Sequence, residues 1–299
     1  MSESRWRVAV VGPGGVGGLL GALMTRAGHE VRYVARPDTA AALNAHGVHV
    51  TSALFGQFHV RAVAAPQATG PVDLCLVTVK AGNLDEALAA VLADTVGDGL
   101  VLPLLNGVEH MAVLRGRFPP GQVVAGAIRV ESTRVGPGRV EHASPFCLID
   151  VASATAPRHR VEALAEQMRG AGPGVAVGDD EATVLWGKLA LLAPMALLTT
   201  HARAPMGVVR DQRRSDLGAV AAEIATVAQA AGAHVELDTV HAMFDRVPFD
   251  FKSSMQRDAE AGRPTELDAI GGAVLRAAQR FGVATPVTAR LVAELGDTG

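Results

Sequence analysis

The stretch that decides the fold is RVAVVGPGGVG, residues 7–17. Its apolar start indicates a short buried strand, and its glycine-rich end matches the G-x-G-x-x-G pattern. In that pattern the first glycine permits a tight turn, the second lets the backbone approach a pyrophosphate, and the third lets a helix pack closely on the strand. The six residues of the motif are Gly12, Pro13, Gly14, Gly15, Val16 and Gly17. This stretch predicts a dinucleotide-binding turn between a strand and a helix.

The segments that follow this turn fit the same architecture. Small apolar residues over 16–27 indicate a helix that lies on a sheet, and its N-terminus would attract phosphate. Further strands are predicted over 30–35, 73–79 and 99–105, with a helix over 84–92. The run 73–79 is continuously apolar, which is typical of a strand buried on both faces. Strands that alternate with helices predict a parallel, doubly wound sheet of the α/β class.

The pattern changes in the second half of the chain. Residues 123–151 look rich in β-structure, with a turn signal at 136–138, and a helix follows over 158–169. From about residue 181 the apolar positions repeat with the long period of helices. The helices predicted there span 181–201, 212–231, 236–244 and 266–281. We place the boundary near Gly178, which predicts a Rossmann domain over 1–178 and an all-helical domain over 179–299.

The composition excludes several functional classes. The 299 residues are 49% hydrophobic and only 4% aromatic, which is ample material for a large aliphatic core. A net charge of −3 gives no general attraction to nucleic acid or to acidic membranes. The N-terminus has no signal-peptide layout, and the longest apolar stretches are interrupted by Gly, Pro or Lys188. We therefore expect a cytoplasmic protein without nucleic-acid or membrane partners.

The cysteines and histidines predict no metal site. Cys75 and Cys147 both lie in apolar surroundings, so we interpret them as reduced thiols of the core. The ten histidines show no H-E-x-x-H or comparable ligand spacing. No G-x-S-x-G elbow is present, which argues against a hydrolase.

The end of the second predicted strand bears on the cofactor. An NAD site normally carries Asp or Glu there, but this sequence reads Tyr33-Val34-Ala35-Arg36-Pro37. An acid would repel a 2′-phosphate, whereas Arg36 can pair with one. The expected cofactor is therefore NADPH. The alternative is that Arg36 is only a solvated surface charge.

Two polar residues follow neighbouring strands. Lys80 ends the run LCLVTVK, and Asn106 ends the next strand in LPLLNGVEH. Both are expected at the carboxyl edge of the sheet, where open α/β sheets bind ligands. The alternative is that each is an ordinary polar loop residue.

Lys188 is the most informative single residue. It lies in VLWGKLALLAPMALL, which is almost entirely apolar. Desolvation in such surroundings would lower the pKa of a lysine and make it a usable proton donor near neutrality. The alternative is a lysine whose apolar stem lies on the helix while its ammonium reaches water.

A third polar cluster lies in FKSSMQRDAEAGRPTELDAIGGAVL. Thr265 and Glu266 precede an apolar helix, and Ser254 and Asp258 lie just upstream. Thr265 could serve only as a helix cap, and residues this polar could also form a solvated turn.

Taken together, these pieces resemble the ketopantoate reductase (2-dehydropantoate 2-reductase) family over essentially the whole chain. The matching stretches come in family order: GPGGVG, VTVK, LLNG, LWGKL, SSMQRD, GRPTELDAIGGAV and GVATP. The resemblance implies that NADPH delivers hydride to the ketone carbon of a 2-oxo acid, which yields a 2-hydroxy acid. Residues 1–178 would then bind NADP, and residues 179–299 would supply the substrate-binding and catalytic groups.

The resemblance also implies a role for each matching residue. Lys188 would protonate the forming alkoxide, and Ser254 would contact the substrate. Lys80 and Asn106 would lie beside the nicotinamide and the substrate. Glu266 would contact the cofactor and help to place the lysine. A positioned ammonium suits this chemistry because hydride addition generates negative charge on oxygen.

The chain departs from the family where the substrate is held. Family members that reduce ketopantoate carry asparagines four and eight residues after the catalytic lysine, and another further along. Those positions are here Leu192, Ala196 and, by a less direct count, Met206. Residues 188, 192 and 196 share one helix face, so that face is aliphatic, and Pro194 is expected to kink the helix. These changes predict a substrate with more apolar surface than ketopantoate.

Three functions remain open from the sequence. The first is a reductase of 2-dehydropantoate or of a less polar 2-oxo acid or ketone. The second is a related β-hydroxyacid dehydrogenase or imine reductase, which the SSMQRD and TELD stretches disfavour. The third is an NADPH-binding regulatory protein without turnover, which the joint presence of Lys188, Ser254 and Glu266 disfavours. The expected partner is a small-molecule substrate, and a homodimer remains open as the oligomeric state.

Overall fold

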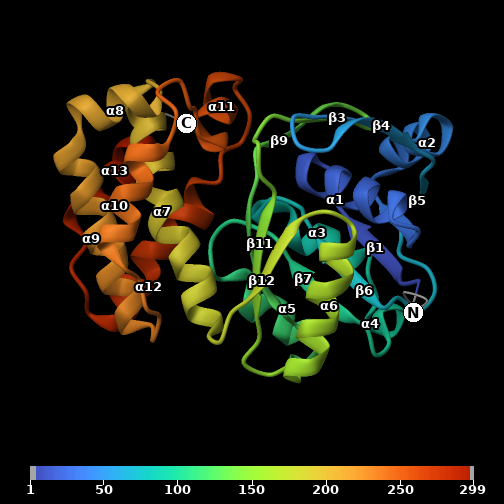
Figure 1. Cartoon of the computed structure of the whole chain (residues 1–299). Helices are drawn as coiled ribbons and strands as arrows, with labels where there is room; N and C mark the ends of the chain where they lie inside the picture. The colour runs from blue at the N-terminus through green and yellow to red at the C-terminus, as the bar shows by residue number, and fades with distance from the viewer. Residues whose placement is uncertain (1–4, 297–299) are drawn as a thin grey trace. The chain divides into compact units, whose positions relative to one another are not determined.

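The computed structural model describes residues 5–296 and divides into two compact units. The first unit runs to Leu105 and resumes over His110–Asp179. The second contains Asn106–Glu109 and the chain from Asp180 onward (Figure 1). The sequence had placed residues 106–109 inside the first domain, but they pack with the helical unit instead.

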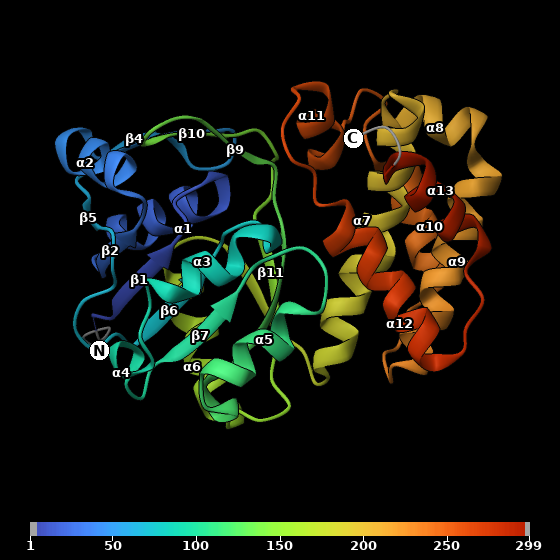
Figure 2. The same cartoon turned by 180° about the vertical axis from the view of Figure 1, so that it is seen from behind.

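The first unit is built on a five-stranded sheet whose strands all run parallel. The order across the sheet is β5-β2-β1-β6-β7, which is the doubly wound arrangement predicted from the sequence (Figure 2). The strands are β1 (Arg7–Val11), β2 (Glu30–Val34), β5 (Val63–Ala65), β6 (Leu74–Val77) and β7 (Leu100–Pro103). Strands β1, β6 and β7 read as near-continuous apolar runs because they are buried on both faces.

Helices connect and cover these strands. They are α1 (Gly15–Arg26), α2 (Pro37–His46), η1 (Ala81–Asn83), α3 (Leu84–Ala89), α4 (Ala93–Val96), α5 (His110–Arg117) and α6 (Arg158–Gly170), with a short η2 (Pro120–Gln122). Helix α1 buries most of its length because its small residues let it lie close to the sheet. The predicted helices over 16–27, 84–92 and 158–169 correspond to α1, α3 and α6.

Two smaller sheets complete the first unit. A four-stranded sheet has the order β4-β3-β10-β9, and a three-stranded sheet has the order β12-β11-β8. Their strands are β3 (Val48–Ser52), β4 (Gly56–Val60), β8 (Ala125–Arg129), β9 (Ser132–Gly136), β10 (Arg139–His142), β11 (Leu148–Ala152) and β12 (Gly174–Val177). The β-rich character predicted for 123–151 is therefore correct, and the turn at 136–138 joins β9 to β10.

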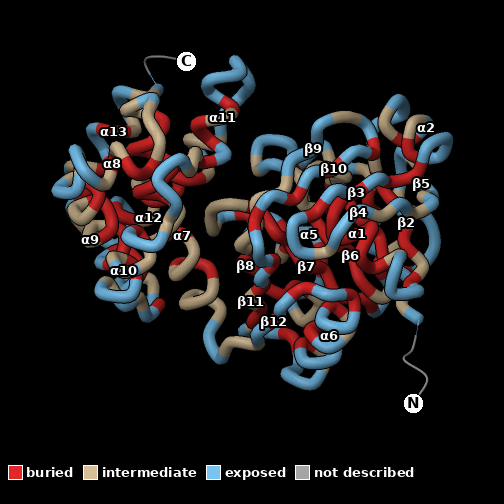
Figure 3. The backbone as a smooth tube through the Cα atoms, turned by 45° about the horizontal axis from the view of Figure 1, so that its top comes forward, coloured by how far each residue is buried: buried red, intermediate tan, exposed pale blue. Residues whose placement is uncertain are grey.

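The second unit is helical. Its elements are α7 (Glu181–Ala202), α8 (Met206–Gln212), α9 (Arg214–Ala230), α10 (Leu237–Arg246), α11 (Ser254–Glu260), the π-helical turn η3 (Asp268–Gly272), α12 (Ala273–Phe281) and α13 (Pro286–Gly296). Asp180 caps the N-terminus of α7, because its side chain accepts a hydrogen bond from the Thr183 amide at 2.6 Å, and the helix continues through Pro194. Buried residues of α7, α8 and α9 form the centre of this unit (Figure 3).

Helix α7 is also the one described helix that is long and apolar enough to cross a membrane. Its mean hydropathy reaches 1.5 over 18 residues, and 61% of that stretch is buried inside the structure. The sequence predicted a helix over 181–201, and α7 runs through Gly187, Lys188 and Pro194 as that prediction requires. Such burial is typical of a helix in the core of a folded unit.

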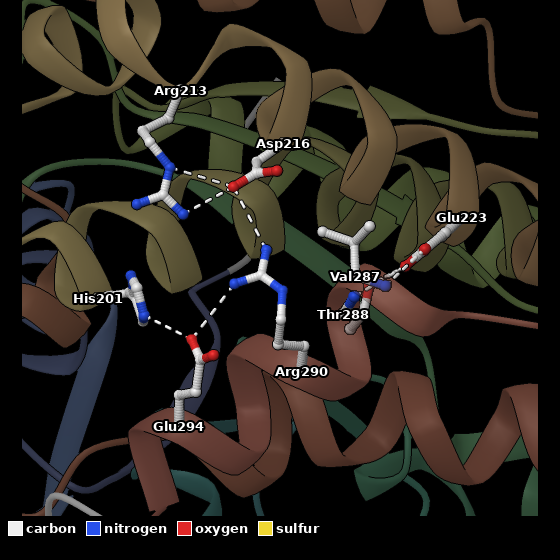
Figure 4. Close-up of polar contacts among 8 residues, drawn as sticks. All are labelled: His201, Arg213, Asp216, Glu223, Val287, Thr288, Arg290 and Glu294. Carbon is white, nitrogen blue, oxygen red and sulfur yellow. Dashed lines mark hydrogen bonds and ion pairs between the residues drawn. The ribbon is translucent and has the colours of Figure 1, made fainter.

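Helix α13 is fastened to α9 by a carboxylate. Glu223 accepts hydrogen bonds from the amides of Val287 and Thr288 at 2.9 Å each, and from the Thr288 hydroxyl at 2.6 Å (Figure 4). These amides belong to the first turn of α13, where no carbonyl of the same helix is available to accept their hydrogen bonds. A side chain from α9 thus caps the last described helix.

A chain of charged groups fastens the rest of α13. Asp216 accepts hydrogen bonds from Arg213 at 2.7 Å and from Arg290 at 3.4 Å. Glu294 binds Arg290 at 3.3 Å and the His201 ring at 2.7 Å (Figure 4). Because His201 lies near the end of α7, this chain joins α9, α13 and α7.

Candidate functional site

The glycine motif forms a tight turn after β1. Gly12 has a φ of +84°, a conformation that favours glycine. The Thr78 hydroxyl, just past β6, lies 2.9 Å from the Val11 carbonyl oxygen and 2.8 Å from the Gly12 carbonyl oxygen. The turn between β1 and α1 is therefore held by the neighbouring strand.

The same turn leaves room for a ligand on one side. A Cβ at Gly17 would lie 2.4 Å from the Gly12 carbonyl oxygen and 2.3 Å from the Thr78 hydroxyl, so only glycine permits this approach of helix to strand. A Cβ at Gly14 would meet no other atom closer than 4.0 Å. Gly14 is also the N-cap of α1 and has no side chain to cap the first amides of the helix. Open space beside uncapped amides fits a pyrophosphate.

The residues predicted to bind the cofactor lie at one edge of the sheet. Strand β1 has β2 on one side and β6 on the other, so the chain reverses direction across the sheet between β1 and β6. Open α/β sheets bind ligands at the carboxyl ends of the strands at such a point. Gly12 follows β1, Arg36 follows β2, and Lys80 follows β6; Arg36 and Lys80 are both exposed. The site suits a dinucleotide.

In the helical unit, two predicted residues meet although they are 160 positions apart. The Asn106 amide nitrogen donates a hydrogen bond of 2.8 Å to the Glu266 carboxylate. The following residue, Gly107, has a φ of +83°, and a Cβ there would lie 2.3 Å from the carbonyl oxygen of Ala269. The backbone after Asn106 therefore lies directly against η3.

Helix α7 places Lys188, Leu192 and Ala196 four residues apart on a single continuous helix. Lys188 and Leu192 are partly buried. Ala196 is only 1% exposed and belongs to the apolar core of the helical unit, as does Met206. Ala196 was predicted to contact the substrate, but it lies in the core of the helical unit. Leu192, one turn after Lys188, remains partly exposed.

Ser254 is exposed at the first turn of α11, and its neighbour Ser253 holds that helix in place. The Ser253 hydroxyl accepts a hydrogen bond from the Gln256 amide at 3.1 Å and pairs with the Thr199 hydroxyl of α7 at 2.8 Å. Both hydroxyls are buried. Sequence reasoning missed Ser253 and Thr199, although a serine before Met255 and Gln256 could have indicated an N-cap.

The polar stretch after Ser254 is a structured helix and turn. Asp258 is mostly buried and accepts a hydrogen bond from the Arg263 side chain at 2.9 Å. The Arg263 amide also donates to the Asp258 carbonyl oxygen at 2.8 Å. The density of polar residues in this stretch therefore reflects contacts that close the end of α11.

The two cysteines lie in the core, as predicted from the sequence. Cys75 and Cys147 are buried free thiols, and burial raises the pKa of each to about 12. Thiols of that kind are inert at neutral pH. Among the described residues, no group of three or more His, Cys, Asp or Glu side chains could hold a metal ion.

Two family sequence models match the chain. The model described as "Ketopantoate reductase PanE/ApbA" matches residues 8–149, and "Ketopantoate reductase PanE/ApbA C terminal" matches residues 182–297. A similar curated protein is the 2-dehydropantoate 2-reductase of Caulobacter vibrioides, which is 29% identical over 96% of this chain and 97% of its own length.

Solved structures share the fold along the whole chain. A 2-dehydropantoate 2-reductase from Geobacter metallireducens is 28% identical with a TM-score of 0.89, over 98% of this chain and 100% of that one. A D-mandelate dehydrogenase in complex with NADH has a TM-score of 0.88 at 21% identity, over 98% of both chains, and shows the shared fold alone. With both family models matched in order and a glycine-rich turn after the first strand of its parallel sheet, this chain belongs to the ketopantoate reductase family, whose members are NADP-dependent oxidoreductases.

Proposed function

We propose that this protein uses NADPH to reduce the ketone of a small 2-oxo acid to the hydroxy acid. The observation that carries this proposal is the 2.8 Å hydrogen bond between Asn106 and Glu266. The family resemblance assigned both residues to the nicotinamide end of the site, and the fold joins them across 160 positions. A chance surface contact would not be expected to select this pair.

The bound cofactor would supply hydride to the carbonyl carbon. Lys188 would hold its ammonium near the carbonyl oxygen and transfer one proton from Nζ to the forming alkoxide, which balances the reaction. The Ser254 hydroxyl is exposed and would donate a hydrogen bond to the substrate carboxylate. Glu266 would accept from Asn106, which keeps the amide oriented toward the reacting groups.

NADPH rather than NADH is the cofactor that the end of β2 favours. Arg36 is exposed after β2, where an acid would bind the ribose hydroxyls of NADH. A guanidinium can form two parallel hydrogen bonds to a phosphate, which makes it suitable for the 2′-phosphate. The D-mandelate dehydrogenase was solved with NADH, so the fold alone does not distinguish NADH from NADPH. The proposal of NADPH therefore depends on Arg36.

The substrate has more apolar surface than ketopantoate in this proposal. Leu192 is partly buried one turn after Lys188, at a position where family members that reduce ketopantoate carry an asparagine. A polar group of the substrate left without a partner costs about 1–3 kcal/mol. A protein of the same fold, D-mandelate dehydrogenase, has been solved with NADH and anilino(oxo)acetate, an N-aryl oxamate that has the shape of an aryl 2-oxo acid.

The test is a panel of candidate substrates, in which turnover is measured as the loss of NADPH absorbance. It contains ketopantoate, a branched aliphatic 2-oxo acid, an aryl 2-oxo acid, a simple ketone and a cyclic imine. We expect turnover of the 2-oxo acids with NADPH. Turnover of the imine alone, or of none of the compounds, would overturn the proposed function.

The same panel decides the substrate class. We expect the aliphatic or aryl 2-oxo acid to have a kcat/KM roughly tenfold above that of ketopantoate, as one lost polar contact at Leu192 would imply. A value for ketopantoate of about 10⁴ M⁻¹s⁻¹ or more, above those of the analogues, would show that this account of the substrate is wrong.

A further inference from the structure

The segment Asn106–Glu109 makes a contact with the 266–276 region at three of its four residues. Asn106 binds Glu266, and Gly107 lies against the backbone of Ala269, as described above. The third contact is an ion pair between Glu109 and Arg276 of α12. The first and last residues of the segment Asn106–Glu109 are thus both bound to the 266–276 region.

The Glu109–Arg276 pair has the geometry of a strong contact. Arg276 Nε lies 2.8 Å from one carboxylate oxygen of Glu109, and Nη2 lies 2.7 Å from the other. Its remaining nitrogen, Nη1, binds Asp268 at 2.7 Å. The hydrogen bonds that Arg276 donates to Glu109 first, and then to Asp268, raise the pKa of Arg276. Two parallel bonds to one carboxylate fix direction as well as distance.

The backbone beneath this pair is shaped to admit it. Asp268 opens the π-helical turn η3, which precedes α12. A Cβ at Gly272 would lie 2.5 Å from an Asp268 carboxylate oxygen and 3.1 Å from Arg276 Nη1. Any larger residue at 272 would therefore displace the Asp268–Arg276 contact. Single π-helical turns of this kind occur often at functional sites.

We propose that Arg276 is a positioning residue for the reaction, which holds Asn106 and Glu266 in register by clamping Glu109 against η3. The inference rests on the proposed function, because it assigns a purpose to the Asn106–Glu266 pair. Arg276 itself touches neither the substrate nor the cofactor in this role. It acts through Glu109 on one side and through Asp268 on the other.

Energetics favour positioning over global stability. The side chains of Arg276 and Glu109 are 46% and 48% exposed, and ion pairs so open to water contribute little to folding. Misplacement of a reacting geometry by about 1 Å can cost up to about a hundredfold in rate. The same pair can therefore matter little for unfolding and much for turnover.

The test compares Arg276→Met with Arg214→Met as a matched control. Arg214 forms a similar two-bonded pair with Asp245 in the same unit, with exposures of 59% and 50%. For Arg276→Met we expect kcat/KM on the best 2-oxo acid to fall on the order of tenfold, with the melting temperature close to that of wild type. Arg276→Lys keeps the charge but loses the parallel bonds, so it should recover only part of the rate.

Two further readouts separate positioning from bulk structure. Hydrogen–deuterium exchange of the peptide 104–114, measured without cofactor, should be faster in Arg276→Met and in Glu109→Gln, but not in Arg214→Met. The double variant Glu109→Gln/Arg276→Met should be no slower in turnover than Arg276→Met alone, because both changes break the same contact.

Several results would overturn the clamp. They are an unchanged kcat/KM in Arg276→Met, an equal loss in Arg214→Met, a fall in melting temperature that parallels the loss of rate, or unchanged exchange over 104–114. If the wild-type protein reduces no 2-oxo acid, the proposed function fails, and the exchange measurement still decides whether Arg276 holds the segment.

Discussion

Lys188 illustrates how much one residue type in one environment can predict. An isolated lysine in an apolar helix suggested a proton donor, and the helix it predicted is the 22-residue α7. Its partial burial fits both a donor in a site and a lysine that reaches water. Substitution distinguishes the two, because only a donor acts in the transition state.

We expect Lys188→Ala to lower kcat by about 10²–10⁴, the contribution of a positioned proton donor. NADPH binding, followed by the fluorescence of the bound cofactor, should remain nearly as in wild type. Lys188→Arg keeps a positive charge but cannot release a proton near neutrality, so it should be almost as slow. Near-normal turnover in Lys188→Arg would mean that the charge alone is needed.

Arg36 supports a second prediction at the same scale. Removing its pairing with a 2′-phosphate in Arg36→Ala should weaken NADPH binding roughly tenfold to a hundredfold. NADH binding should change little, since NADH has no phosphate there. Arg61→Ala, an exposed arginine between β4 and β5, serves as the control. Equal Kd values for the two cofactors in the wild-type protein, measured by calorimetry, would contradict the role of Arg36.

At the scale of elements, the sequence predicted the longest helices and the central strands, whereas the helices α8, α11 and α13 were missed. The helices α7 and α9 are long apolar segments, and the strands β1, β6 and β7 are short, continuous apolar runs, so local sequence was enough to predict them. Helix α11 was missed because its polar residues resemble a solvated turn, whereas Met255 and Gln256 are buried. The π-helical turn η3 was read as ordinary helix because one extra residue in a turn leaves no signal in the apolar pattern.

The buried pair Thr199–Ser253 allows a prediction for α11. Ser253→Ala removes the N-cap of α11 and leaves the Thr199 hydroxyl with one partner fewer, which should cost about 1–3 kcal/mol of unfolding free energy. Ser254→Ala, one residue later and exposed, should leave stability unchanged. Urea unfolding curves of both variants measure the difference. Equal midpoints would show that α11 does not depend on this cap.

At the scale of the whole molecule, the candidate site could be predicted only in part. The cofactor half was accessible because a glycine motif and the strand ends that follow it are local features. The contacts of Asn106 and Glu109 join residues 160 and 167 positions apart, and no local pattern reports such pairs. Ala196 was assigned to the substrate although it lies in the core, because one helix face does not reveal what covers it.

The charged chain on α13 predicts how the molecule responds to acid. Hydrogen bonds from Arg213, which make the largest contribution, hold the pKa of Asp216 below its usual value. A carboxylate with a lowered pKa in the folded state stabilises the fold above its unfolded pKa of about 4, and that stability is lost as the pH falls through the lower folded value. We therefore expect the melting temperature of wild type to fall between about pH 5 and pH 3.

The variant that tests this prediction is Asp216→Asn. Its control is Asp238→Asn, because Asp238 is an exposed residue at the start of α10. The melting temperature of Asp216→Asn should fall less than that of wild type over the same pH range, because the variant has no carboxyl group at position 216 to be protonated. Asp238→Asn should follow wild type. If all three proteins lose the same amount, the chain around Asp216 does not contribute to the acid response.

The four residues Asn106–Glu109 have a consequence for dissecting the gene. The polypeptide leaves the first unit after Leu105, contributes this short piece to the second, and re-enters the first at His110. No single cut in the DNA can therefore separate the two units cleanly. A fragment ending at Asp179 would carry Val108 without the apolar core it packs against, and a fragment starting at Asp180 would lack the residues that Glu266 and Arg276 bind. Produced separately, the second half would be incomplete, because it needs a stretch of chain that the first half encodes.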